Sequence, residues 1–182
     1  MFKRERATRR ERGLVLLELL VAVCVLAILA ALAAPSFAAI SERQKLRAAV
    51  DALTTSLYTA RAEAYKRGGH VTLAQSSAPD CMPGEGNSRW RCGWTLFADA
   101  DEDGVRDSGD ELILAEHLPP GIDIRQTSER RALKLNAFGQ FSGQQGLGFV
   151  LSSEARKDMA TAICISSGGR VQRFAGASRC PG

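Results

Sequence analysis

The sequence predicts an α+β protein in which one long N-terminal helix packs on an antiparallel β-sheet body. Two features of the sequence indicate this fold. An apolar run near the N-terminus continues into a segment with helical periodicity, and short strand-like segments separated by turn residues occupy the rest of the chain. We expect a basic leader at residues 1–13, a helix at 14–67 and a β-rich globular body at 68–182. One helix followed by a series of strands is typical of α+β domains.

The first half of the predicted helix is an apolar segment at 14–34 whose only ionisable side chain is Glu18. A helix of about 20 apolar residues spans the hydrocarbon core of a bilayer, so we expect this segment to cross a membrane. The leader carries six basic and two acidic side chains. Basic residues beside a membrane span stay in the cytoplasm, which places the body outside the cytoplasm.

A cleaved secretory signal peptide and a plain membrane anchor are two other interpretations of the apolar segment. The apolar region of a signal peptide is only about 7–15 residues long, which is shorter than this one. An ionisable residue inside a membrane span raises the free energy of insertion by about 2.5–3.5 kcal/mol on insertion scales. Neither interpretation gives a reason for the chain to keep such a residue at Glu18. We therefore expect Glu18 to have a function.

The second half of the predicted helix is amphipathic. Its apolar residues recur at alternating spacings of four and three, namely Leu46, Val50, Leu53, Leu57, Ala60 and Ala64. This spacing places them on one face of a helix, which we expect to be buried in the core. Lys66 and Arg67 suit the negative C-terminal end of a helix, and Gly68 and Gly69 are expected to end it.

The body contains eight segments with the pattern of short strands, bounded by turn residues. They are expected at residues 70–74, 94–98, 111–117, 122–126, 132–135, 148–151, 162–166 and 170–174. The polar segment 75–91 contains several prolines and glycines and is predicted to be a loop.

Composition argues against an enzyme. The chain has only two histidines, His70 and His117, and it lacks the common nucleotide-binding, zinc-protease and serine-hydrolase motifs. Beyond the leader, basic and acidic side chains are equal in number, with an acidic excess at 14–120 and a basic excess at 121–182. We expect no catalytic residues and no cofactor other than a calcium ion at one acidic segment.

That segment, at 99–111, lies between two predicted strands. As a calcium loop of the EF-hand type it offers five carboxylate ligands, namely Asp99, Asp101, Asp103, Asp107 and Asp110. Its flanks resemble strands, whereas an EF-hand loop has helices on both sides, and its last ligand is an aspartate where that loop has a glutamate. The alternative is a hairpin turn that uses aspartate and glycine for their backbone preferences.

Four of the five cysteines lie in the predicted body, and the fifth, Cys24, lies in the apolar segment. Outside the cytoplasm, cysteines persist as disulfides. Of the three pairings that four cysteines allow, we favour Cys81 with Cys92 and Cys164 with Cys180. A zinc site is the weaker alternative, because the chain has no Cys-x-x-Cys motif.

The residues Gly-Leu-Val-Leu-Leu-Glu from Gly13 to Glu18, with the basic leader and Pro35, resemble the cleavage region of type IV prepilins. The resemblance implies that a prepilin peptidase cuts after Gly13 and methylates the new N-terminus at Leu14, and that the apolar helix is retained. It also implies that Glu18 and Pro35 serve assembly with other major and minor pilins in a helical fibre. Because a buried charge is tolerated only when paired, we expect Glu18 to neutralise the Leu14 amine of a neighbouring subunit.

The segments 60–67, 71–73 and 93–97 resemble the FimT/GspH family of type IV minor pilins and type II secretion pseudopilins. The family implies a type IV pilin-like fold and a single-pass inner-membrane protein with a cytoplasmic leader and a periplasmic body, which later enters a pilus or pseudopilus. We expect a minor pilin that takes part in initiating and assembling a type IV pilus. The alternative is a GspH-like minor pseudopilin of a type II secretion system.

The C-terminal end is basic, because Arg170, Arg173 and Arg179 occur there and residues 164–182 contain no acidic side chain. Some FimT-type pilins bind DNA during uptake through a C-terminal Gly-Arg-x-Arg motif, from which residues 169–173 differ by one extra residue. The resemblance implies salt-sensitive contact between these arginines and double-stranded DNA. The alternative is a solvated basic edge strand that discourages aggregation.

Overall fold

The computed structural model describes residues 11–76, 88–142 and 147–181. Within the helix, the side chains of residues 11–14, 30 and 32–36 lie outside this description. The chain forms two compact units, Met1–Ser41 and Glu42–Gly182. Helix α1, Glu11–Arg67, contributes residues to both units, and the described strands belong to the second.

Helix α1 ends at the residue that the sequence predicts. Lys66 and Arg67 form its last turn. Gly68 then has a φ of 73°, a conformation that glycine adopts without steric cost. The amide nitrogen of Gly69 donates to the carbonyl of Ala64 at 2.8 Å, which satisfies one carbonyl of the last turn.

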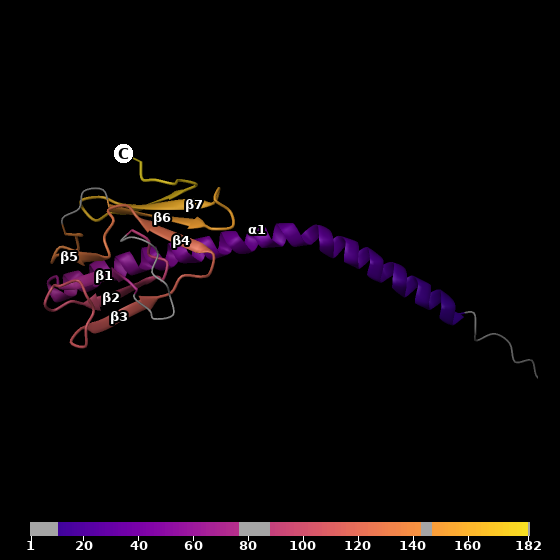
Figure 1. The fold of residues 1–182 in the computed structure, drawn as a ribbon, viewed down its shortest axis with the longest axis horizontal. Helices are drawn as coiled ribbons and strands as arrows, with labels where there is room; N and C mark the ends of the chain where they lie inside the picture. The colour runs from indigo at the N-terminus through magenta and orange to yellow at the C-terminus, as the bar shows by residue number, and fades with distance from the viewer. Residues whose placement is uncertain (1–10, 77–87, 143–146, 182) are drawn as a thin grey trace, which may run out of the picture. The chain divides into compact units, whose positions relative to one another are not determined.

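The strands form two antiparallel sheets of four strands each (Figure 1). The first sheet has the order β3-β2-β1-β5 and contains Val71–Gln75 (β1), Trp94–Ala98 (β2), Glu111–Glu116 (β3) and Ala132–Leu135 (β5). The second has the order β4-β6-β7-β8 and contains Ile122–Gln126 (β4), Leu147–Ser153 (β6), Ala160–Ile165 (β7) and Val171–Ala175 (β8). The predicted antiparallel body is confirmed, but the sequence did not predict that its strands divide between two sheets.

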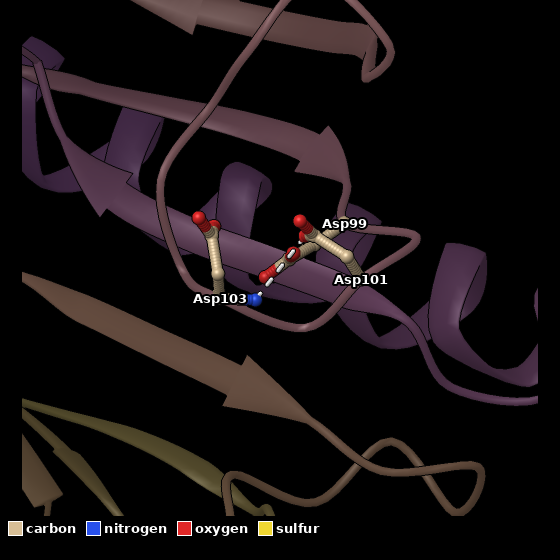
Figure 2. A group of neighbouring side chains, drawn as sticks. All are labelled: Asp99, Asp101 and Asp103. Carbon is tan, nitrogen blue, oxygen red and sulfur yellow. Dashed lines mark hydrogen bonds between the residues drawn. The ribbon is translucent and has the colours of Figure 1, made fainter.

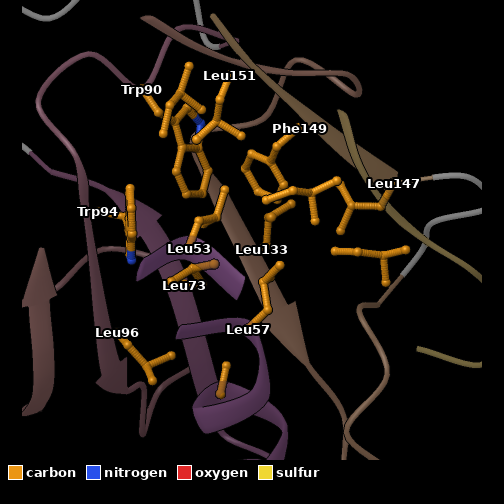
Figure 3. Packing of buried hydrophobic residues seen from close by; sticks show 14 of the residues in the cluster. Leu53, Leu57, Leu73, Trp90, Trp94, Leu96, Leu133, Leu147, Phe149 and Leu151 are labelled. Atoms are coloured by element: carbon orange, nitrogen blue, oxygen red, sulfur yellow. The ribbon is translucent and has the colours of Figure 1, made fainter. Parts of the chain in front are cut away.

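The second half of α1 lies between the two sheets (Figure 1), and its predicted apolar stripe is buried. Leu53, Leu57, Ala60 and Ala64 are fully inaccessible to solvent. Figure 3 shows Leu53 and Leu57 in one cluster with Leu73 of the first sheet and Phe149 of the second. Because full burial of a leucine side chain contributes about 1.5–3 kcal/mol, this stripe stabilises the body more than any single polar contact does.

Hydrogen bonds of polar side chains also connect α1 to both sheets. The indole Nε1 of Trp94 donates to Ser56 Oγ at 2.9 Å, and this hydroxyl donates in turn to the carbonyl of Ala52 at 2.9 Å. Arg61 donates from Nε to the carbonyl of Gly139 at 3.1 Å and from Nη1 to the carbonyl of Gly169 at 2.6 Å. Gly139 follows the first sheet's β5, and Gly169 lies in the turn before β8 of the second sheet. One guanidinium on α1 therefore holds a turn from each sheet.

Candidate functional site

The first unit carries the predicted assembly residues on α1. Glu18 is exposed and lies within a run of exposed apolar side chains. Each member of this run exposes 50–67% of its surface, namely Val15, Leu16, Leu17, Leu19, Leu20, Val21, Val23, Val25, Leu26, Ile28 and Leu29. Contiguous apolar surface of this kind marks contact with protein or membrane.

Gly13, Leu14 and Pro35 fall within α1, at positions whose side-chain surroundings lie outside the described residues. Glu11 is the first described residue and is already helical, so α1 includes the predicted start at Leu14.

Among the described residues, no helix combines the length and hydropathy that a membrane crossing requires. The span expected at 14–34 stays a prediction.

The acidic segment forms the loop between β2 and β3, and Figure 2 shows three of its aspartates. Asp99 is completely buried at the end of β2. Its Oδ2 accepts from Thr72 Oγ1 at 2.5 Å and from the Gly104 amide at 3.1 Å. One carboxylate oxygen from each of Asp99, Asp101 and Asp103 lies within 4.8 Å of the other two. Three of the five predicted calcium ligands therefore lie together.

Asp107 and Asp110 do not belong to this group of three. Asp107 Oδ1 instead accepts from the Gly109 amide at 2.7 Å, and Asp110 Oδ2 accepts from the Asp107 amide at 3.0 Å. These side chains hold the second half of the loop in a turn, which is the backbone role that the alternative interpretation gave to aspartate here.

A basic residue at the end of α1 holds the far end of the acidic loop, and sequence inspection did not single out this contact. Arg67 donates to both carboxylate oxygens of Glu111, the first residue of β3, at 2.9 and 3.1 Å. Its Nε also donates to Glu63 at 2.8 Å. Hydrogen bonds from Arg67 are the main cause that lowers the pKa of Glu111 and the pKa of Glu63.

The three predicted DNA-binding arginines are exposed but differ in their partners. Arg173 on β8 makes an ion pair with Asp51 on α1, a residue 122 positions away in the chain. Arg170 donates to the side chain of Gln172 at 3.4 Å, and Arg179 follows β8 in the C-terminal segment. Local sequence gave no sign of this pair, because Asp51 lies on another element far away in the chain.

The cysteines bear out one predicted pairing. Cys164 on β7 and Cys180 form a disulfide, which excludes the zinc alternative for these two residues. Cys92 is also disulfide-bonded, whereas its predicted partner Cys81 lies outside the described residues. Cys24 is a free, exposed cysteine on α1.

Comparison with known proteins gives one family and one type of fold. A family model described as type II transport protein GspH matches residues 49–169. A crystal structure of the type IV minor pilin FimU from Pseudomonas aeruginosa strain PAO1 is similar to 78% of this chain and 99% of that chain, with 19% identity and a TM-score of 0.58. A second crystal form of FimU gives 74% and 99% coverage, 18% identity and a TM-score of 0.53. The likeness confirms the predicted type IV pilin-like fold. No curated protein matches.

Replacing Arg67 with methionine should destabilise the fold more at about pH 7 than at about pH 3. Carboxyl groups whose pKa is lowered by folding stabilise the folded state above their ordinary pKa, and this stabilisation is lost as the pH falls through the lowered value. Urea unfolding of the full chain in detergent micelles, followed by tryptophan fluorescence, measures the free energy of unfolding of both forms.

Lys66→Met is the matched control, because Lys66 contacts Glu63 at 3.4 Å and makes no ion pair with Glu111. Lys66→Met should change the pH dependence of the free energy of unfolding less than Arg67→Met does. If Arg67→Met lowers the free energy of unfolding equally at both pH values, the ion pairs of Arg67 do not contribute to the pH dependence of stability.

Proposed function

Because the chain belongs to the GspH family of type II transport proteins, its role is that of a minor pilin or pseudopilin, and we propose that it takes part in initiating and assembling a type IV pilus. The observation that carries this proposal is the difference in solvent exposure between the two parts of α1. Its later part is the core of the body, whereas residues 15–29 expose eleven large apolar side chains. Such a helix supplies a subunit with an exposed apolar contact surface.

We propose that this apolar surface contacts two environments in turn. Before assembly it lies in the inner membrane, with the leader in the cytoplasm and the body in the periplasm, as the basic leader indicates. After assembly it packs against the equivalent helices of other pilins. Both environments are apolar, so the transfer leaves the hydrophobic side chains away from water.

Glu18 is proposed to direct the packing of neighbouring subunits. It is one carboxylate within the exposed apolar run, and a charge in such surroundings is costly unless it has a partner. Cleavage after Gly13 by a prepilin peptidase would supply that partner as the amine of Leu14. An intersubunit pair between Glu18 and this amine fixes the axial position of one helix against the next, because a shifted register leaves both charges unpaired.

A minor pseudopilin of a type II secretion system is the second candidate, and the description of the matching family favours it. The two candidates require the same fold and the same apolar helix. They differ in the fibre that the subunit joins. Recovery of the chain with sheared pili or with secretion pseudopili therefore decides between them.

Contact with double-stranded DNA stays a prediction and is not required by the proposed function. Arg170 and Arg179 are exposed and have no carboxylate partner among the described residues, which supports it. Arg173 does not add to that support, because its charge is compensated by Asp51.

Processing at Gly13 is the first test of this function. We expect the mature protein to lack residues 1–13 and to carry one added methyl group on Leu14, because the helix must be kept and the charged leader removed. Intact-mass spectrometry of the protein from its native host measures both changes. A mature N-terminus near Ala34 would instead establish a conventional signal peptide and remove the basis for fibre assembly.

Glu18→Ala should reduce incorporation into the fibre while leaving the chain in the membrane fraction. Removing a carboxylate from an apolar segment favours insertion, whereas the neighbour's Leu14 amine loses its partner. Immunoblots of sheared pili, of secretion pseudopili and of membranes compare the fractions. Cys24→Ala, in the same exposed run and without a change of charge, is the matched control and should assemble as wild type does. Equal incorporation of Glu18→Ala and wild type would rule out the proposed pairing.

A further inference from the structure

We propose that the loop between β2 and β3 binds one calcium ion through the carboxylates of Asp99, Asp101 and Asp103. Each residue offers one oxygen, and the three oxygens lie within 4.8 Å of one another. Figure 2 shows the three side chains directed into the space that the loop encloses. Two oxygen ligands on opposite sides of one Ca²⁺ are about 4.6–5.2 Å apart, so a single ion can contact all three.

The buried state of Asp99 is the second observation that points to a cation. Its side chain has no solvent exposure, and its Oδ1 has no hydrogen-bond partner. The other oxygen, Oδ2, is already held by Thr72 and Gly104, so the carboxylate is fixed with one oxygen unpaired. Burial of a carboxylate is costly unless the charge is paired or coordinates a metal. A cation in this loop would remove that cost.

The described residues provide no protein cation for this cluster. None of the ion pairs among them includes Asp99, Asp101 or Asp103. Lys134 also reaches this loop, but its ammonium donates to the carbonyl of Glu102 rather than to a carboxylate. Three negative charges therefore lie together, and a bound ion would offset their mutual repulsion.

Backbone contacts already hold the two exposed carboxylates in place. Asp101 Oδ1 accepts from the Asp103 amide at 3.3 Å, and Asp103 Oδ1 accepts from the Val105 amide at 2.6 Å. Among the described residues, the second oxygen of each carboxylate has no hydrogen-bond donor. The loop is thus ordered before an ion arrives, which reduces the conformational entropy that binding would cost.

The ligand chemistry favours calcium over other cations. All three protein ligands are carboxylate oxygens, which hard cations prefer. Ca²⁺ accepts six to eight oxygens in irregular arrangements, whereas Mg²⁺ requires near-ideal octahedral geometry at about 2.0–2.1 Å. Three carboxylates without a bidentate glutamate resemble the weaker extracellular sites, so we expect a Kd of about 10⁻⁴–10⁻³ M.

Isothermal titration calorimetry of the full chain in detergent micelles, after removal of calcium by a chelator, tests the proposal. Titration with CaCl₂ should show one saturable site per chain, and the melting temperature should rise by about 3–8 °C at about 10 mM CaCl₂. MgCl₂ at the same concentration should give a smaller rise. Absence of saturable calcium binding, or an equal rise with MgCl₂, would overturn the proposal of a calcium site.

Two variants identify the ligands. Asp101→Ala with Asp103→Ala should abolish both the binding heat and the calcium-dependent rise, while melting in chelator shows that the variant still folds. Asp107→Ala is the matched control, because it removes an aspartate of the same loop that lies outside the group of three. It should retain calcium binding. Binding that survives in the double variant, or is lost in Asp107→Ala, would assign the ion to other ligands and contradict the proposal.

Discussion

Burial of one face of α1 between two antiparallel sheets is the interaction on which the rest of this structure depends. Each sheet alone would leave an apolar face in water, and the stripe that includes Leu53 and Leu57 covers both faces at once. The directional contacts follow from this placement. Trp94 reaches Ser56, and Arg61 reaches Gly139 and Gly169, only because the helix lies between the sheets.

The same helix also links the fold to the proposed function. Residues 42–67 are amphipathic and bury one apolar face in the core, whereas residues 15–29 are mostly apolar and exposed in the isolated chain. The buried stripe and the exposed apolar run thus lie on different parts of one helix. The body in turn presents loops, and the acidic loop after β2 is held at its far end by Arg67 on α1. Cation binding in that loop would thus act on a segment tied directly to the core helix.

Features that depend on local sequence could be predicted. Periodicity identified the buried stripe of α1, glycines identified its end, and three strands, Trp94–Ala98, Ile122–Gln126 and Ala132–Leu135, have the predicted bounds. Features that depend on distant pairing could not. β5 pairs with β1, more than fifty residues earlier, while β4 pairs with β6 in the other sheet. Strand patterns alone do not specify partners, so the two sheets were missed. The ion pair of Arg173 with Asp51 was missed for the same reason. The separation of Asp107 and Asp110 from the other aspartates has a local cause, because their side chains accept hydrogen bonds from backbone amides of the loop.

Native-state hydrogen exchange of the full chain in micelles, at increasing denaturant, tests whether the body depends on this helix. If the stripe is the shared core, backbone amides at 46–64 should exchange only through global unfolding, with the same free energy of opening as amides in β1 and β6. The helix and both sheets would then form one cooperative unit. Exchange of the 46–64 amides at a clearly lower free energy than the strands would show that the sheets hold together without the helix, and would contradict the account.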